Sequence, residues 1–207
     1  MRFLVLFLAL LATARAADTP LEAWLKRQVS ITSLDAKFTQ ERKLPALKNP
    51  VTTPGRLCFS KPGKLRWQLG DPAETLAISD GTTLTLIDTA AKTARRTAVD
   101  SPQAARFSLL SGQAFETPEK FHQTFEIIES RATAGVFQYT LKAKDRRIRS
   151  QISWIFLDID PEKNELRALE MELQDKSRLR TIFQQPRFNL KLEDSLFSPD
   201  LTGYDVK

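Results

Sequence analysis

The chain has 207 residues, and its 31 lysines and arginines against 25 aspartates and glutamates give it a formal net charge of +6. A chain of this length can bury a sizeable core within one domain. Its single cysteine, Cys58, excludes an internal disulfide, and its single histidine, His122, excludes a histidine-rich metal site.

The first sixteen residues have the pattern of an export signal. Arg2 supplies a positive charge, residues 3–13 are apolar, and Ala14-Arg15-Ala16 is a cleavage site for signal peptidase. A membrane-spanning helix would need about 20 apolar residues, and this run is much shorter. We therefore predict export and cleavage after Ala16, which leaves one domain over residues 17–207. Loss of Arg2 and Arg15 leaves 29 basic and 25 acidic residues, a charge of +4 that permits attraction to anionic headgroups or an acidic partner.

The mature chain begins with signals for a helix and then for a strand. Thr19-Pro20-Leu21-Glu22 combines a capping threonine, a proline suited to the first turn and a capping-box glutamate. Apolar residues then recur at helical spacing, which predicts an amphipathic helix over 20–30. From Leu34 to Phe38 apolar and polar residues alternate, which predicts a strand with one solvated face.

Short strands separated by turns follow, which is typical of an antiparallel meander. Residues 45–54 contain three prolines and are predicted to form a loop. Strands are predicted over 55–61 and 64–69, around Leu76 and Ile78, and around Leu84 and Leu86. The turns between them carry Pro62-Gly63, Asp71-Pro72 and the hairpin dipeptide Asp80-Gly81.

Two helices interrupt the meander before further strands complete it. The first is predicted from Ser101-Pro102 to Gly112 and the second, which is shorter, from Thr117-Pro118. Strand patterns then include Phe125 and Ile127, residues 137–141 and 151–159, Leu166 and Ala168, and residues 179–183, with a helical turn around Leu196-Phe197. The basic run 142–149 is interpreted as a solvated hairpin end, with a headgroup or partner patch as the alternative.

Few helical residues are available to cover some ten strands, although the apolar face of a sheet must be covered. One solution is a barrel filled by its own side chains. Another is an incompletely closed barrel with helices across its mouth and a cavity beneath them. Periodicity alone leaves both architectures open.

The sequence contains no recognisable catalytic site. Cys58 and His122 could form a nucleophile–base pair only if the fold brought them together, and no G-x-S-x-G elbow accompanies the histidine. Acidic residues are plentiful, but no carboxylate pair stands in a recognisable arrangement. Cys58 lies in an apolar strand and is predicted to be a small buried side chain. We therefore predict a protein that is not an enzyme and that has no cofactor and no metal.

Three segments carry a resemblance to a known family. They are FTQ at 38–40, GRLCFSKPGKLRW at 55–67 and SDG at 79–81. In this order they resemble the LolA-like outer-membrane lipoprotein carriers, and the pattern G-x-L-x-F-x-K-P-x-x-L-x-W is the most specific part. The resemblance extends over the mature chain and is strongest from Leu34 to Leu86.

The resemblance implies a mainly β, α+β fold in which a curved antiparallel sheet forms an unclosed half-barrel and a few helices cover its concave face. It implies a periplasmic, monomeric carrier that shields the acyl chains of lipoproteins in a hydrophobic cavity. Such carriers receive their cargo from an inner-membrane ABC transporter and deliver it to an outer-membrane acceptor. Nucleic acid is not an expected partner, because export removes the chain from it. A shuttle for free lipid or a lipid-linked product, and a protein-binding or sensor domain, are the alternatives.

The resemblance also implies candidate site residues. Cavity-lining side chains are expected at Leu57, Phe59, Leu65, Trp67, Leu84, Leu86, Phe107 and Leu110. Ordinary core packing is the alternative for such apolar residues. Many members of the family have an arginine at the position of Lys61, where it links the sheet to the lid helix. Lys61 is therefore a candidate lid latch without the planar fork of arginine, and a solvated strand-end lysine is the alternative.

Overall fold

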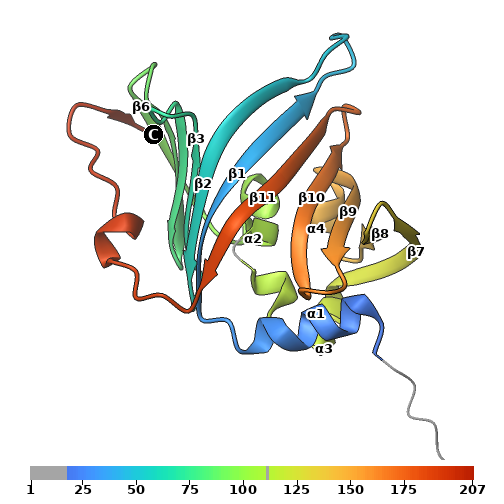
Figure 1. Cartoon of the computed structure of the whole chain (residues 1–207). Coiled ribbons are helices and arrows are strands. Elements are labelled where there is room, and N and C mark those ends of the chain that lie inside the picture. Colours follow the sequence, from blue (N-terminus) through green and yellow to red (C-terminus); the bar gives the residue numbers. More distant parts are fainter. Residues whose placement is uncertain (1–17, 111) are drawn as a thin grey trace, which may run out of the picture.

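The computed structural model describes residues 18–110 and 112–207, so the predicted signal segment 1–16 lies outside the described residues. Within them, twelve strands form one curved sheet with the order β12-β6-β5-β4-β3-β2-β1-β11-β10-β9-β8-β7 (Figure 1). The strands β7 and β12 lie at opposite edges, so the sheet does not close. The predicted unclosed half-barrel is confirmed, and a closed barrel is not formed.

The strands pair mostly as hairpins. Their bounds are β1 Ser33–Lys43, β2 Val51–Ser60, β3 Lys64–Leu69, β4 Thr75–Asp80, β5 Thr83–Asp88, β6 Thr93–Ala98, β7 Phe125–Thr133, β8 Val136–Ala143, β9 Ile152–Asp160, β10 Glu165–Leu173, β11 Arg178–Phe188 and β12 Asp205–Val206. Each neighbouring pair is antiparallel except β12 with β6. β1 pairs with β2 on one side and with β11 on the other, so the first strand joins the two halves of the sheet.

Helices cover the inside of the curve (Figure 1). They are α1 Pro20–Val29, η1 Pro102–Ala104, α2 Ala105–Leu110, η2 Gln113–Phe115, α3 Pro118–Thr124 and α4 Arg146–Arg149, while η3 Asp194–Phe197 belongs to the C-terminal segment. The Thr19 hydroxyl accepts a hydrogen bond from the backbone N–H of Glu22, so the predicted N-terminus of α1 is confirmed. Among these helices, none is long and apolar enough to cross a membrane.

The main core fills the space between the sheet and the helices. α1 buries Leu21, Trp24 and Leu25, and α3 buries Phe121. The ring of Phe115 lies 5.3 Å from that of Trp24 and 5.7 Å from that of Phe125, measured between centroids, so η2 ties α1 to the start of β7. Aromatic pairs at this spacing add to the free energy gained by burial.

The C-terminal segment covers the outer, convex face of β3–β6. Ile78, Ile87 and Ala94 point outward and are buried, and Leu201 and Tyr204 pack against them. Lys64 pairs with Asp194 at 2.7 Å, and Arg66 donates to the carbonyl of Leu196. The segment then adds β12 to the edge of β6. The outward side chains of Ile78 on β4 and Ile87 on β5 are therefore covered on the convex side.

The structure departs from the sequence prediction at several places. β2 begins at Val51, so the last part of the predicted 45–54 loop is strand, and Pro54 lies within β2 opposite Thr39. β6 was not predicted, because the polar sequence TARRTA shows little apolar alternation. The basic run 142–149 leads from β8 toward its antiparallel neighbour β9 and is mostly exposed, as predicted, but it contains a short helix, capped by Asp145, whose Ile148 is buried.

Cys58 is buried, as predicted, but it lies on the convex face next to a buried carboxylate. Its sulfur is 3.7 Å from Oδ1 of Asp35. Arg56 donates to both carboxylate oxygens of Asp35, at 2.8 and 3.0 Å, and Arg187 donates to Oδ2. The hydrogen bonds from Arg56 lower the pKa of Asp35 from its ordinary value of 3.8, and Arg187 lowers it further.

Candidate functional site: the concave face of the sheet

The family-like motif in β2 and β3 places its apolar side chains on the concave face. Leu57 lies opposite Trp67 and Phe59 lies opposite Leu65, and residues paired across an antiparallel ladder point to the same side. All four side chains are buried in the main core. Arg56, Cys58 and Arg66 have the other parity and lie on the convex face. The alternation of the motif therefore sets one wall of the concave face.

Gly55 lets two aromatic rings stack at the start of this wall. The rings of Phe38 and Trp67 lie 4.0 Å apart between centroids with an interplanar angle of 21°. A Cβ at position 55 would lie 2.2 Å from Cζ of Phe38 and 2.4 Å from the carbonyl oxygen of Gln68. Only glycine allows the Phe38 ring to lie against the backbone of β2 in this way.

α2 lies over the middle of the concave face, where the lid helix is expected (Figure 1). Its Phe107, Leu109 and Leu110 side chains are all buried in the main core. A Cβ at Gly112, which follows α2, would lie 3.8 Å from the ring of Phe59. The end of α2 therefore packs directly on β2.

Two cavities remain beneath and beside α2, and Leu110 lines both. The smaller one has a volume of about 70 Å³ and lies between α1, α2 and the strands β1, β2, β10 and β11. Its walls are formed by Trp24, Gln28, Leu34, Ala36, Leu57, Phe59, Leu109, Leu110, Gly112, Phe115, Leu166, Leu169, Phe183, Pro186 and Phe188. Gln28 is the one polar side chain among them.

The larger cavity of about 320 Å³ opens toward the far ends of β1 and β2. Trp67, Phe107, Leu110 and Met171 form apolar parts of its wall, and Arg42 is among the polar ones. Pockets for drug-sized ligands measure about 300–1,000 Å³. The smaller cavity is far below this range, so a ligand of that size fits beneath α2 only if α2 moves outward.

The predicted site residues are brought to one face of the sheet but not to one cavity. Leu57, Phe59 and Leu110 line the smaller cavity, and Trp67, Phe107 and Leu110 line the larger one. Leu86 lines a polar cleft of about 660 Å³ that also contains Arg95 and Ser150. Leu65 and Leu84 are each 1% exposed and lie within the core, away from the walls of these cavities.

Lys61 makes its hydrogen bond to α1 rather than to α2. Its Nζ lies 3.1 Å from the carbonyl oxygen of Gln28, in the last turn of the helix. The resemblance had placed this bond on the lid helix near Phe107. Lysine at this end of a helix satisfies a free carbonyl and is favoured by the helix dipole.

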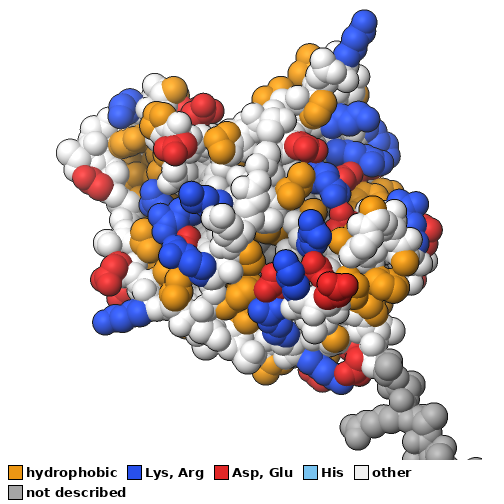
Figure 2. All heavy atoms as spheres, in the orientation of Figure 1, with side chains coloured by type: hydrophobic (Ala, Val, Ile, Leu, Met, Phe, Trp, Pro, Cys, Tyr) orange, Lys and Arg blue, Asp and Glu red, His pale blue; other side chains and the backbone are white. Residues whose placement is uncertain are grey.

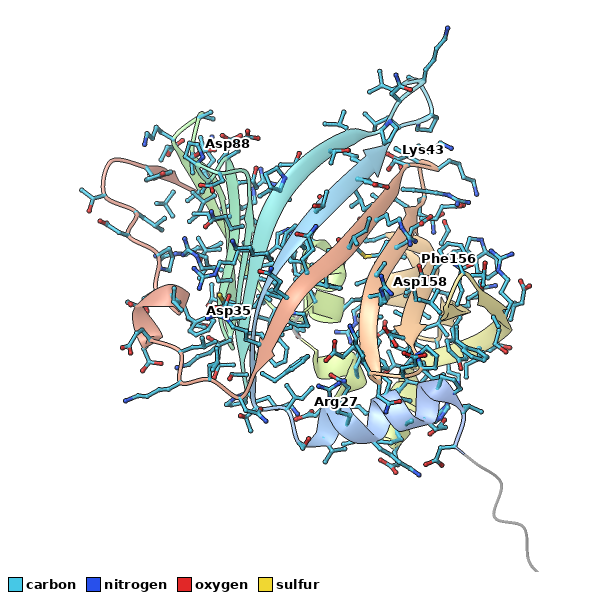
Figure 3. The ribbon with its side chains drawn as sticks, viewed as in Figure 1. Arg27, Asp35, Lys43, Asp88, Phe156 and Asp158 are labelled. Carbon is cyan, nitrogen blue, oxygen red and sulfur yellow. The ribbon has the colours of Figure 1, made fainter. Side chains whose placement is uncertain are left out.

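Further polar contacts hold α1 against the sheet. Arg27 donates to the carbonyl of Lys163 at 2.6 Å and to the carboxylate of Glu165 at 3.1 Å, and Figure 3 shows it reaching from α1 toward the strands. The backbone N–H of Leu21 donates to the hydroxyl of Tyr139, and burial raises the pKa of this tyrosine. Polar contacts therefore fix α1 to β8, to β10 and to the turn that precedes β10.

A family model described as outer membrane lipoprotein carrier protein LolA matches residues 29–200. The chain belongs to the LolA family. The outer-membrane lipoprotein carrier protein of Psychromonas ingrahamii is 31% identical to it over 80 residues. That alignment covers 39% of this chain and 39% of the relative. The matched part of the chain therefore spans well under half of the relative's length.

Solved structures share the fold of this LolA-family protein. An uncharacterised conserved protein from Thermus thermophilus aligns with 90% of this chain and 96% of its own, with a TM-score of 0.51 and 8% identity. A DUF1329 family protein from Desulfovibrio piger aligns with 86% and 94%, with a TM-score of 0.50 and 12% identity. At such identities the likeness shows the fold alone.

Much of the cavity wall in this LolA-family protein comes from strands that sequence reasoning did not assign to the site. β1 contributes Leu34 and Ala36, β10 contributes Leu166 and Leu169, and β11 contributes Phe183 among others. Alternation showed that β1 has one apolar face. It did not show that β11 lies beside β1, since 145 residues separate Phe38 from its partner Phe183 and the pairing contains a bulge.

Proposed function

We propose that this LolA-family protein is a periplasmic carrier that shields the acyl chains of lipoproteins on its concave face and moves them from the inner to the outer membrane. The observation that carries the proposal is the pair of cavities lined largely by apolar side chains under and beside α2. The export signal predicted at 1–16 and the family membership support the periplasmic location. An inner-membrane ABC transporter as donor and an outer-membrane acceptor belong to the same proposal.

The energetics of acyl transfer require such a shield. Each CH₂ group removed from water contributes about 0.8 kcal/mol, so a lipid anchor does not cross the aqueous periplasm unaided. The same free energy of burial opposes release of the cargo from the carrier. We infer that the cargo displaces α2, whose Phe107 and Leu110 then exchange contacts with the sheet for contacts with the acyl chains. Part of the binding free energy is thereby offset, which permits delivery.

A matched pair of variants in β11 tests acyl binding. Phe183 lines the smaller cavity, and the next residue, Ile182, points to the convex face opposite Thr39 and Ala168. Both are partly buried. Phe183→Glu should weaken binding of a fluorescent tripalmitoyl lipopeptide at least about tenfold, because a carboxylate in the wall opposes hydrocarbon. Ile182→Glu should bind like the wild type.

Equal affinities of the folded wild type and Phe183→Glu for the lipopeptide would contradict the proposal. Mass spectrometry of species that copurify with the protein from the periplasm identifies the cargo class. Acylated lipopeptides support a lipoprotein carrier. Free lipid or a lipid-linked product would replace this cargo by the first alternative, and an unlipidated protein segment would replace it by the second.

A further inference from the structure

The hairpin between β1 and β2 projects beyond the rest of the sheet (Figure 1). The last pair of residues in its ladder is Arg42 with Val51, and β11 accompanies β1 only as far as Lys43. Residues 44–50 therefore extend past both neighbouring strands. A hydrogen bond from the N–H of Leu47 to the carbonyl of Leu44, 3.0 Å long, closes a turn whose second residue is Pro45. The tip is therefore a hydrogen-bonded turn at the end of the paired strands β1 and β2.

This tip, residues 42–51, combines exposed apolar side chains with positive charge. Leu47 is 45% exposed and Val51 is 50% exposed. Arg42, Lys43 and Lys48 are the charged residues of the segment, which contains no aspartate or glutamate. Within the described residues, Lys43 and Lys48 make no salt bridge or hydrogen bond through their side chains. Arg42 makes no direct ion pair there either, but hydrogen bonds from Ser177 and the charge of Arg42 lower the pKa of Asp175. Figure 2 shows blue and orange side chains together at this projection, and Figure 3 labels Lys43 beside it.

The tip is also the lip of the larger cavity. Arg42, Val51 and Thr53 line this cavity together with Trp67 and Leu110. Val51 therefore belongs both to the exposed apolar surface of the tip and to the cavity wall. Val51 thus connects the exposed surface of the tip with the wall of the larger cavity.

A second exposed apolar pair lacks the positive charge and the access to a cavity that are found at the tip. Ile127 and Ile128 on the edge strand β7 are 39% and 48% exposed. They lie between Glu126 and Glu129, so their immediate surroundings repel an anionic surface. They are absent from the walls of the described cavities. Apolar exposure, positive charge and access to the cavity coincide at 42–51.

We propose that the tip 42–51 docks on the surface of an anionic lipid bilayer, with Leu47 and Val51 in the headgroup boundary and Arg42, Lys43 and Lys48 facing lipid phosphates. Interfacial segments bind membranes through this pairing of buried apolar area with basic residues. Docking places the mouth of the larger cavity against the bilayer, so that acyl chains pass between them without crossing water. The passage of acyl chains rests on the proposed carrier function, whereas docking does not.

Charge and apolar contact make separable contributions to docking. A basic residue near an anionic surface strengthens binding about fivefold, and this contribution weakens as salt screens it. Burial of the exposed part of Leu47 adds about tenfold. Lys48→Glu should therefore lower vesicle affinity at least about fivefold, and Leu47→Glu at least about tenfold.

Flotation of the purified protein with lipid vesicles tests the proposal. The wild type should float with phosphatidylglycerol vesicles and remain unbound with phosphatidylcholine vesicles. Leu47→Glu and Lys48→Glu should reduce flotation, and Ile128→Glu, which changes a residue of similar exposure, should leave it unchanged. Absence of wild-type flotation with phosphatidylglycerol would overturn the proposal, as would equal losses in Leu47→Glu and Ile128→Glu. A loss confined to Ile128→Glu would also overturn it.

A local probe tests which segment meets the lipid. The native Cys58 is 1% exposed, so a polarity-sensitive dye on Leu47→Cys or Ile128→Cys labels the introduced thiol. The dye at position 47 should report an apolar environment on phosphatidylglycerol vesicles, and the dye at position 128 should not. An unchanged signal at position 47 would overturn the proposal even if the protein floats. Phe183→Glu should float like the wild type, so failure of docking and failure of acyl binding are distinguished.

Discussion

At the scale of single residues, the concave wall depends on side chains that are absent as much as on those that are present. Gly55 leaves room for the ring of Phe38, which stacks on Trp67 and helps to close the wall between β1 and β3. On the convex face a side chain that is present has the equivalent role: the buried carboxylate of Asp35 pairs with the guanidinium groups of Arg56 and Arg187. Both arrangements are non-local, and both join β1 to its neighbours.

Gly55→Ala should destabilise the protein by about 3 kcal/mol, because the added methyl group meets Phe38 and the backbone of β3 in a packed core. Gly135→Ala is the matched control. Its Cβ would meet no atom within 4 Å, and its left-handed backbone should cost about 1–2 kcal/mol. Urea unfolding of the three proteins measures the difference. A smaller loss in Gly55→Ala than in Gly135→Ala would show that Phe38 moves aside freely.

Asp35 should make stability depend on pH in a defined direction. Its folded pKa is lowered below the ordinary value of 3.8 by Arg56 and then Arg187, so its contribution is complete above that value and is lost as the pH falls through the folded pKa. The free energy of unfolding of the wild type should exceed that of Asp35→Asn at neutral pH. The gap should narrow below about pH 4. Unfolding of both proteins over a pH series measures this gap, and a constant gap would contradict the assignment.

At the scale of elements, the two helices on the concave side differ in how they are held. α1 is fastened by Lys61, Arg27 and Tyr139 in addition to its buried apolar face. The described side chains of α2 that enter the core are apolar. Because the cavity beneath α2 holds only about 70 Å³, we expect α2 to move for cargo while α1, to which Lys61 is bonded, remains in place.

Lys61→Met should loosen α1 by about 1 kcal/mol, the net value of a typical hydrogen bond. Lys61→Arg should differ little from the wild type, because the acceptor is a single carbonyl oxygen and not a carboxylate that can accept two parallel bonds. Hydrogen exchange of the α1 amides, together with lipopeptide release rates, measures both effects. Faster release in Lys61→Met without faster exchange in α1 would place the latch elsewhere.

At the scale of the whole molecule, the open sheet is supported from both sides. The helices fill the concave side of the curve, and the C-terminal segment crosses the convex side of β3–β6 and ends as β12 on the edge (Figure 1). Phe197 anchors this segment and is 3% exposed. An edge that is covered in this way is protected from pairing with other chains.

Phe197→Ala should release the C-terminal segment and destabilise the protein by about 3–5 kcal/mol. Hydrogen exchange should rise first in β4–β6, whose outward residues Ile78 and Ile87 lose their cover, and less in β8–β10. Leu196→Ala, at a partly buried neighbour, is the control and should have a smaller effect. A uniform rise in exchange across the sheet would show that the segment does not stabilise one half selectively.

The local elements of this protein follow from the sequence alone, because caps, turns and side-chain periods act over a few residues. The helix start at Thr19, the hairpin at Asp80-Gly81 and the alternation through Leu57, Phe59 and Trp67 all follow from near neighbours in the chain. The weak pattern of β6 and the strand within the proline-rich 45–54 segment escaped prediction, since pairing with neighbouring strands overrides local preference there.

Which of these elements contact one another depends on the tertiary structure. The pairing of β1 with β11, the bond from Lys61 to α1 and the burial of Leu65 and Leu84 away from the cavity walls depend on contacts between distant segments. Leu110 lines both cavities of the concave face, and Arg42 and Val51 of the hairpin 42–51 line the larger one. These positions depend on contacts between distant segments as well. A two-residue period shows that a strand has an inner face, but packing free energy decides what that face touches and where space remains.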